Sequence, residues 1–225
     1  MGGVGAGGVP NGTAMDRPPL KEVPVHPDNG RRQYEAVTPR LPDGPIDLTE
    51  LLPGDGPLEL DVGFGRGASL FTRHEVAPRS RIIGVEIKSK WSYKVEARCQ
   101  RLGLENVRAF AGDIRELLAR SGPKACLSKV FLHFPDPWWK KRHRGRLVLQ
   151  PAVLDDLARL IGSGGVLFVQ TDVEDRMALY ESLVAEHAAF EGERLDHNPY
   201  GSVSNREARA IEDGLPIHRL RATRR

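Results

Sequence analysis

The sequence predicts an α/β domain with a doubly wound, mostly parallel sheet and helices on both faces. Five short apolar runs alternate with segments in which apolar residues recur every three or four positions. Such strand–helix alternation is typical of parallel strands joined by crossover helices. With 40% hydrophobic and 28% charged residues in 225, the chain has the composition of a globular protein.

The predicted elements follow one another without an internal repeat. The apolar runs predict strands at 58–62, 81–86, 107–111, 129–134 and 165–171. The periodic segments predict helices at 68–75, 88–102, 114–119, 151–161 and 173–186. A last run, 216–223, alternates apolar and basic residues, which predicts an antiparallel strand added at one edge of the sheet.

The first 57 residues differ in composition from the rest. They hold 10 of the 17 prolines and 10 of the 24 glycines and have no long apolar periodicity. We therefore expect residues 1–57 to form an arm with little structure of its own, and residues 58–225 to form the folded domain.

Composition also excludes several classes of protein. Two cysteines, Cys99 and Cys126, cannot build a disulfide framework, and no Cys-x-x-Cys pair is present to bind zinc. No apolar run approaches the roughly 20 residues that span a bilayer. We expect a protein of the reducing cytoplasm, without a membrane or a metal site.

Each predicted parallel strand ends at or near a carboxylate. These five residues are Asp61, Glu86, Asp113, Asp136 and Asp172. Ligands of open α/β sheets bind outside the carboxyl ends of the strands, so the five side chains should converge on one crevice. Each could instead cap the helix that follows. An acidic crevice suits a cationic ligand such as S-adenosylmethionine better than a phosphate-rich cofactor.

A glycine-rich loop follows the first strand and supports this interpretation. Its glycines at 63, 65 and 67 match neither the dinucleotide fingerprint nor a phosphate-binding P-loop. Glycines here let the backbone approach a flat ligand, which makes Gly63 and Gly65 candidate cofactor-binding residues. A tight strand-to-helix turn without any ligand is the alternative.

The fourth strand leads into an unusual segment, Phe-Pro-Asp-Pro-Trp-Trp-Lys-Lys-Arg-His-Arg. Prolines on both sides restrict the backbone of Asp136. Trp138 and Trp139 offer flat surfaces for a nucleobase. Five cations, suited to phosphate groups, follow within seven positions: Lys140, Lys141, Arg142, Arg144 and Arg146. Taken singly, these residues could form a solvated basic loop and a buried aromatic plug.

Together these motifs resemble the signature Phe-Pro-Asp-Pro-Trp-x-Lys-x-Arg-His of the bacterial single-chain tRNA (guanine-N7-)-methyltransferases, a family with the Rossmann-like class I methyltransferase fold. The resemblance covers about residues 58–225 and includes the Asp-x-Gly-Phe-Gly-x-Gly, Gly-Val-Glu, Gly-Asp, Thr-Asp and Gly-x-Pro-Ile-x-Arg-Leu motifs in order.

The resemblance implies roles for individual residues. It implies Asp61, Glu86, Asp113 and Asp136 as cofactor ligands, with Asp136 also the catalytic position. It implies tRNA-binding positions at Lys140, Asp172, Ser204, Asn205, Arg206 and Glu207. Asp61 stands where the family usually has Glu, and Ser204 stands where it has Thr. The pattern Ser204-Asn-Arg-Glu207 is also that of a helix capping box.

The implied reaction is methyl transfer from S-adenosylmethionine to N7 of a tRNA guanine, expected in the variable loop at position 46. Guanine N7 carries a lone pair and no proton, so no general base is required. We expect Asp136 and Asp172 to orient the base through its N1–H and amino group, which adenine cannot match. Phe134 or Trp138 could stack on the base once it is turned out of its own stack.

Several alternatives stay open at this stage. We expect no obligatory protein subunit, so the enzyme would act as a monomer or a homodimer. An NAD-dependent oxidoreductase would share the sheet and Glu86, but the glycine spacing disfavours it. A methyltransferase acting on another RNA or on protein, and a non-catalytic RNA-binding relative, are further possibilities.

Overall fold

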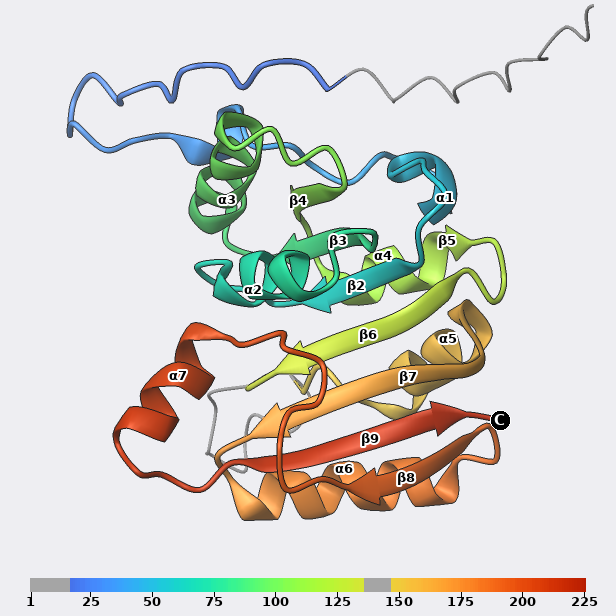
Figure 1. Cartoon of the computed structure of the whole chain (residues 1–225). Helices are drawn as coiled ribbons and strands as arrows, with labels where there is room; N and C mark the ends of the chain where they lie inside the picture. Colours follow the sequence, from blue (N-terminus) through green and yellow to red (C-terminus); the bar gives the residue numbers. More distant parts are fainter. Residues whose placement is uncertain (1–16, 136–146) are drawn as a thin grey trace, which may run out of the picture.

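The computed structural model describes residues 17–135 and 147–225 and contains a seven-stranded sheet (Figure 1). Its strand order is β4-β3-β2-β6-β7-β9-β8. The strands are β2 (Leu58–Val62), β3 (Arg81–Glu86), β4 (Val107–Ala111), β6 (Leu127–His133), β7 (Ile161–Thr171), β8 (Phe190–Arg194) and β9 (His218–Arg224). The predicted α/β fold with a mostly parallel sheet is therefore confirmed.

The last two strands reverse direction relative to the others. β4, β3, β2, β6 and β7 are parallel, whereas β9 runs antiparallel to both β7 and β8. The antiparallel C-terminal strand is thus confirmed, but β8 lies outside it and forms the edge. β8 was not predicted because four of its five residues are exposed, which leaves no apolar run to detect.

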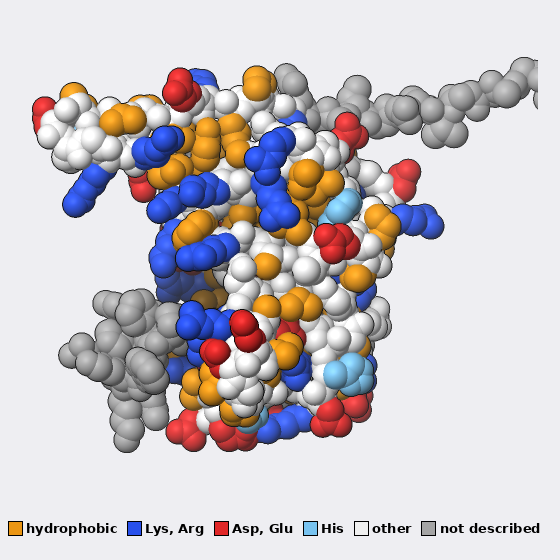
Figure 2. Space-filling model, turned by 60° about the vertical axis from the view of Figure 1, so that its left-hand side comes forward, with side chains coloured by type: hydrophobic (Ala, Val, Ile, Leu, Met, Phe, Trp, Pro, Cys, Tyr) orange, Lys and Arg blue, Asp and Glu red, His pale blue; other side chains and the backbone are white. Residues whose placement is uncertain are grey.

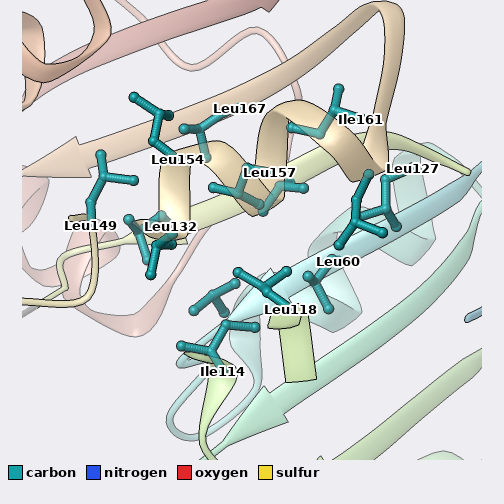
Figure 3. Close-up of a cluster of buried hydrophobic side chains, with 14 of the residues drawn as sticks. Leu60, Ile114, Leu118, Leu127, Leu132, Leu149, Leu154, Leu157, Ile161 and Leu167 are labelled. Atoms are coloured by element: carbon teal, nitrogen blue, oxygen red, sulfur yellow. The ribbon is translucent and has the colours of Figure 1, made fainter. Parts of the chain in front are cut away.

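The helices divide between the two faces of the sheet. α2 (Ala68–Val76) and α3 (Ser89–Arg101) pack on one face, while α4 (Ile114–Arg120), α5 (Pro151–Leu160) and α6 (Glu174–Glu186) pack on the other. The second face holds the larger core, in which leucines of α4 and α5 meet those of β2, β6 and β7 (Figure 3). No helix among the described residues has the length and hydropathy needed to cross a membrane.

Alternation along β3 shows how one strand supplies both cores. Ile82 belongs to the smaller cluster beneath α2 and α3, whereas Ile83 and Val85 belong to the larger one. Consecutive side chains of a strand point to opposite faces. A strand covered on both faces therefore has an uninterrupted apolar run, which is why the sequence located the bounds of β2, β3 and β4 correctly.

The C-terminal part of the chain covers the rest of the face occupied by α2. Tyr200 packs edge-on against Phe131 of β6 and Phe168 of β7, with ring centroids 5.9 and 5.0 Å away. After this loop comes α7 (Asn205–Glu212), which lies beside the tips of β6 and β7 (Figure 1). The loop thus brings α7 to the carboxyl edge of the parallel strands.

The ordered structure begins upstream of the predicted boundary at residue 58. Short elements precede it: η1 (Tyr34–Ala36), β1 (Ile46–Asp47) paired with β5 (Ser121–Gly122), and α1 (Leu48–Leu51). Ile46, Leu48, Leu51 and Leu52 are buried in the larger core. This short apolar segment was not predicted because prolines and glycines surround it. Residues 46–52 therefore contribute to the core of the domain, upstream of the predicted boundary.

A buried ion pair between Glu59 and Arg73 links β2 to α2. Glu59 is completely buried, and its carboxylate accepts hydrogen bonds from Nε and Nη2 of Arg73, at 2.7 and 2.6 Å, and from the Ser80 hydroxyl. Arg73 also donates to the carbonyl of Tyr200 at 2.7 Å. The pair therefore links β2, α2 and the C-terminal loop.

Replacing this arginine should destabilise the fold. In Arg73→Met, Glu59 would keep only Lys129, whose Nζ lies 3.6 Å from Oε1, as a cationic partner. We expect the free energy of unfolding to fall by about 3–5 kcal/mol in urea denaturation, because a buried charge loses its partner. Adding Glu59→Gln should restore part of the loss, and a decrease below about 1 kcal/mol would contradict this role.

Candidate active site

Two adjoining clefts lie at the carboxyl ends of the parallel strands. The first has a volume of about 340 Å³ and the second about 640 Å³. Gly63, His133, Phe134 and Pro135 line both. The predicted crevice therefore exists, and it is divided into two compartments that meet at the tips of β2 and β6.

The first cleft is lined by two carboxylates and two cations, the cations being Lys88 and Arg115. Glu86, the last residue of β3, and Asp113, which precedes α4, both line it. Glu86 accepts hydrogen bonds from the backbone N–H groups of Gly65 and Lys88, at 3.0 and 2.9 Å. The Arg115 guanidinium, 2.6 Å from Asp113, holds the pKa of that carboxyl below its usual value. Asp113 also caps α4, because its side chain accepts from the Arg115 backbone N–H at 2.9 Å, so the helix-capping alternative holds for this residue.

The glycine loop forms the floor between the two compartments. Gly63 has φ of 70°, in the left-handed region that side chains avoid, and a Cβ there would meet no atom within 4 Å. A ligand can therefore approach this backbone closely. Gly67 is required for packing instead, because a Cβ on it would lie 2.5 Å from Cγ2 of Val95.

Asp61 is buried beneath this loop without a polar partner. Its side chain belongs to β2, is 1% exposed, and forms no hydrogen bond with any described residue at either carboxylate oxygen. Burial raises the pKa of Asp61 to about 7, with Glu86 and Glu59 contributing and the nearby Ser69 hydroxyl opposing the rise. A buried, unpartnered carboxylate of this kind is costly to the fold and favours binding of a cationic ligand.

The second cleft brings together four of the predicted substrate residues. Asp172, Ser204, Asn205 and Arg206 line it, at the ends of β7 and the start of α7. Nε and Nη2 of Arg206 donate to Oδ2 of Asp172. Other lining residues were not singled out from the sequence: Arg66, Ser69, Thr171, Val173 and Arg176. With three arginines against one carboxylate, this compartment is basic.

Glu207 differs from this expectation. It is 1% exposed and lines neither cleft, and its carboxylate accepts from Gln170, Asn198 and Arg219 at 2.9, 3.2 and 3.3 Å. Ser204 Oγ accepts from the Glu207 backbone N–H at 3.1 Å, which is half of a capping box. Glu207 therefore anchors α7 rather than facing a ligand. The polar Gln170 within the apolar run of β7 was the available signal for this buried network.

The shared wall combines a neutral histidine with a strained backbone. Burial lowers the pKa of His133 to about 3. Gln170 donates to its Nδ1 at 2.8 Å, which leaves Nε2–H to donate to Ser202 Oγ at 3.0 Å. His133 is thus a packed core histidine.

The next residue, Phe134, has a strained backbone. Its φ of 49° is rare for a bulky side chain and typical of functional sites.

The remaining predicted site residues lie outside the described residues. These are Asp136, Lys140, Lys141, Arg142, Arg144 and Arg146, together with Trp138 and Trp139. The last described residue before them is Pro135, which lines both clefts. Among residues 17–135 and 147–225, no group of three His, Cys, Asp or Glu side chains could hold a metal ion.

Comparison with known proteins decides the family. The model of a family described as "Putative methyltransferase" matches residues 55–220. A tRNA (guanine-N(7)-)-methyltransferase of Synechococcus sp. is 33% identical over 218 residues, covering 92% of each chain. This chain belongs to the tRNA (guanine-N(7)-)-methyltransferase family. The Myxococcus xanthus member is 32% identical over 198 residues, covering 81% of this chain and 96% of that protein.

Solved structures agree with this at the level of fold. The aminoglycoside resistance methyltransferase NpmB1 superposes with a TM-score of 0.55 at 20% identity, covering 78% of this chain and 92% of its own. The 16S rRNA methyltransferase KamB gives a TM-score of 0.56 at 17% identity, covering 78% and 91%. Family and fold together make the chain an S-adenosylmethionine-dependent methyltransferase, as the sequence motifs implied, and not a dehydrogenase.

The residues of the first cleft fit S-adenosylmethionine. That cofactor supplies an electrophilic methyl group on a sulfonium centre. Glu86, which lines this cleft, suits its ribose hydroxyls. Asp61 lines neither cleft, but it lies beneath the glycine loop without a hydrogen-bond partner among the described residues, and it suits the ammonium group of a ligand that reaches it past Gly63. The open approach to Gly63 leaves room for its amino-acid end, while Asp113 is placed to accept from the adenine amino group.

Asp61→Asn should change how the unfolding free energy depends on pH. The folded protein keeps the Asp61 proton up to about pH 7, whereas an unfolded chain loses it near pH 3.9. The unfolding free energy of the parent should therefore fall between about pH 4 and 7, by up to about 4 kcal/mol. Asn does not titrate and avoids this loss, so the unfolding free energy of the variant should rise relative to that of the parent from about pH 4 to 7 and then level off.

The same variant should bind S-adenosylhomocysteine about 10- to 100-fold more weakly in calorimetry, since one charge-assisted hydrogen bond is lost. The exposed Asp55→Asn is the matched control and should change neither property. Parental affinity in Asp61→Asn would rule out a ligand contact at this carboxylate.

Proposed function

We propose that this chain transfers the methyl group of S-adenosylmethionine to N7 of a guanine in tRNA, at position 46 of the variable loop. The observation that carries the proposal is that a cleft holding the carboxylates Glu86 and Asp113 meets a basic cleft at Gly63 and Phe134, in a member of this family. The two carboxylates suit the cationic methyl donor. The basic one suits a nucleotide with its flanking phosphates.

Asp172 is suited to orient the guanine. Both hydrogen bonds from Arg206 go to Oδ2, so Oδ1 has no partner among the described residues and can accept from the base. A carboxylate here can accept from guanine N1–H and the exocyclic amino group, which turns N7 on the other edge towards the donor. Adenine lacks this pair of donors and would leave the carboxylate unpaired.

The surroundings of the base agree with a reaction that requires no proton acceptor. His133, the only histidine lining either cleft within the described chain, is buried and neutral, and both its ring nitrogens are hydrogen-bonded. The enzyme therefore contributes mainly by alignment, which can supply about 7–11 kcal/mol of rate enhancement. Phe134, at the junction of the clefts, is suited to stack on the base.

We further propose roles for the segment after Pro135. Asp136, the next residue in the chain, would orient the base or the donor, and Trp138 would offer a second stacking surface. Lys140, together with Lys141, Arg142, Arg144 and Arg146, would contact tRNA phosphates. Cys99 and Cys126 are both free thiols, which suits a reducing cytoplasm, and we propose that the enzyme acts without an obligatory protein subunit.

The proposed activity can be tested directly. The purified chain should methylate unmodified tRNA, and borohydride reduction followed by aniline cleavage should cut the product at one guanine in the variable loop. Replacing that guanine by adenine should abolish labelling, because the orienting carboxylates lose both donors. Labelling of a ribosomal RNA fragment instead of tRNA would assign a different substrate.

Asp136→Asn tests the proposed orienting role. It keeps the size of the side chain but replaces an acceptor with a donor, so kcat should fall by about 100-fold or more through misalignment. Affinity for tRNA should stay within about twofold, because most affinity comes from phosphate contacts. Full activity in this variant would show that Asp136 is not needed for orientation.

A further inference from the structure

The helix α3 has three distinct sides. Val95 and Cys99 point into the smaller core. A second side contacts the N-terminal segment, where Tyr93 donates to the carbonyl of Lys21 at 2.9 Å and Gln100 donates to that of Pro18 at 3.2 Å. The third side is covered by neither. It carries Lys90, Lys94 and Arg98 at four-residue intervals, with Trp91 beside them.

Trp91 is surrounded by cations. Arg66, from the glycine loop, lies 5.2 Å from the centroid of the indole ring, and the amino groups of Lys90 and Lys94 lie 5.4 and 5.7 Å from it. The ring is partly exposed. Three cations within about 6 Å of one aromatic ring form a compact positive site with a flat surface at its centre.

These cations have no acidic partners within the described part of the chain. None of Arg66, Lys90, Lys94 and Arg98 forms an ion pair there, and the one acid of α3, Glu96, is buried and pairs with Arg17 and Arg108. The guanidinium of Arg98 is held 3.9 Å above the ring of Phe71. Like charges held together without counter-charges repel one another, and an anionic ligand relieves that repulsion.

This surface is continuous with the active site. Arg66 lines the second cleft and Lys88, which precedes α3, lines the first. Lys and Arg side chains gather on one side of the molecule in the view of Figure 2. Their charge therefore extends outward from the place where the target nucleotide would enter.

We propose that the α3 basic face, formed by Arg66, Lys90, Trp91, Lys94 and Arg98, binds the RNA strand that flanks the target nucleotide. The cations contact its phosphates, and Trp91 stacks on an unpaired base. This inference rests on the proposed function, since it names a second contact region for the same substrate. Unpaired cations around an exposed aromatic ring are the combination with which proteins bind single-stranded nucleic acid.

The test compares two double variants of the full chain. Lys90→Gln/Lys94→Gln removes two cations from the α3 basic face, and neither residue lines a cleft. Arg79→Gln/Lys124→Gln is the matched control, because it changes net charge equally at exposed positions next to the amino ends of β3 and β6. Affinity for unmodified tRNA is measured by fluorescence anisotropy over a range of salt concentrations, alongside KM and kcat.

We expect the α3 variant to bind tRNA about tenfold more weakly, with a salt slope smaller by about 1.4–1.8 for two lost phosphate contacts. KM for tRNA should rise in parallel, while kcat at saturating tRNA and affinity for S-adenosylhomocysteine stay unchanged. Trp91→Leu should weaken binding without changing the salt slope, and Trp91→Phe should retain most of it. The control should match the parent.

Equal tRNA affinity of the α3 variant and the control would overturn the proposal. So would a parent that does not bind tRNA. A parent that binds tRNA through α3 but methylates none would refute the proposed function and still support this surface, because the anisotropy result does not depend on turnover.

Discussion

The second compartment of the active site depends on one buried polar network. Glu207, Gln170 and Arg219 hydrogen-bond to one another across α7, β7 and β9. All three are almost fully buried, so any one left without its partners would be strongly destabilising. The network therefore fixes α7 beside the sheet and sets Ser204, Asn205 and Arg206 at the cleft.

Two carboxylates on β2, Glu59 and Asp61, differ in their hydrogen-bond partners. Glu59 and Asp61 are two residues apart and so share one face of the strand. Glu59 has Arg73, Ser80 and Lys129 around it and stabilises the junction of β2 with α2. Asp61 has no hydrogen-bond partner among the residues that the structure describes, and its burial raises its pKa. A site that binds a cationic cofactor retains an unsatisfied carboxylate because the ligand completes it.

The charge distribution differs between the two compartments. Carboxylates and cations both line the first compartment, arginines predominate in the second, and α3 extends the positive surface beyond both. The carboxylates Glu86 and Asp113 suit a cationic donor, and the arginines of the second compartment suit a polyanionic acceptor. The two compartments share Gly63 and residues 133–135.

The sequence alone determined the parallel sheet, the helices between its strands and the carboxylates at the strand ends, because doubly covered strands leave uninterrupted apolar runs and turn residues are local signals. Glu86, Asp113 and Asp172 accordingly line the crevice. Only the tertiary structure decided that β8 forms the edge, that Glu207 anchors rather than binds, and that Arg66 and α3 share a surface. These outcomes depend on contacts between residues far apart in the chain, such as Arg219 with Glu207 or Arg66 with Trp91, which no local pattern encodes.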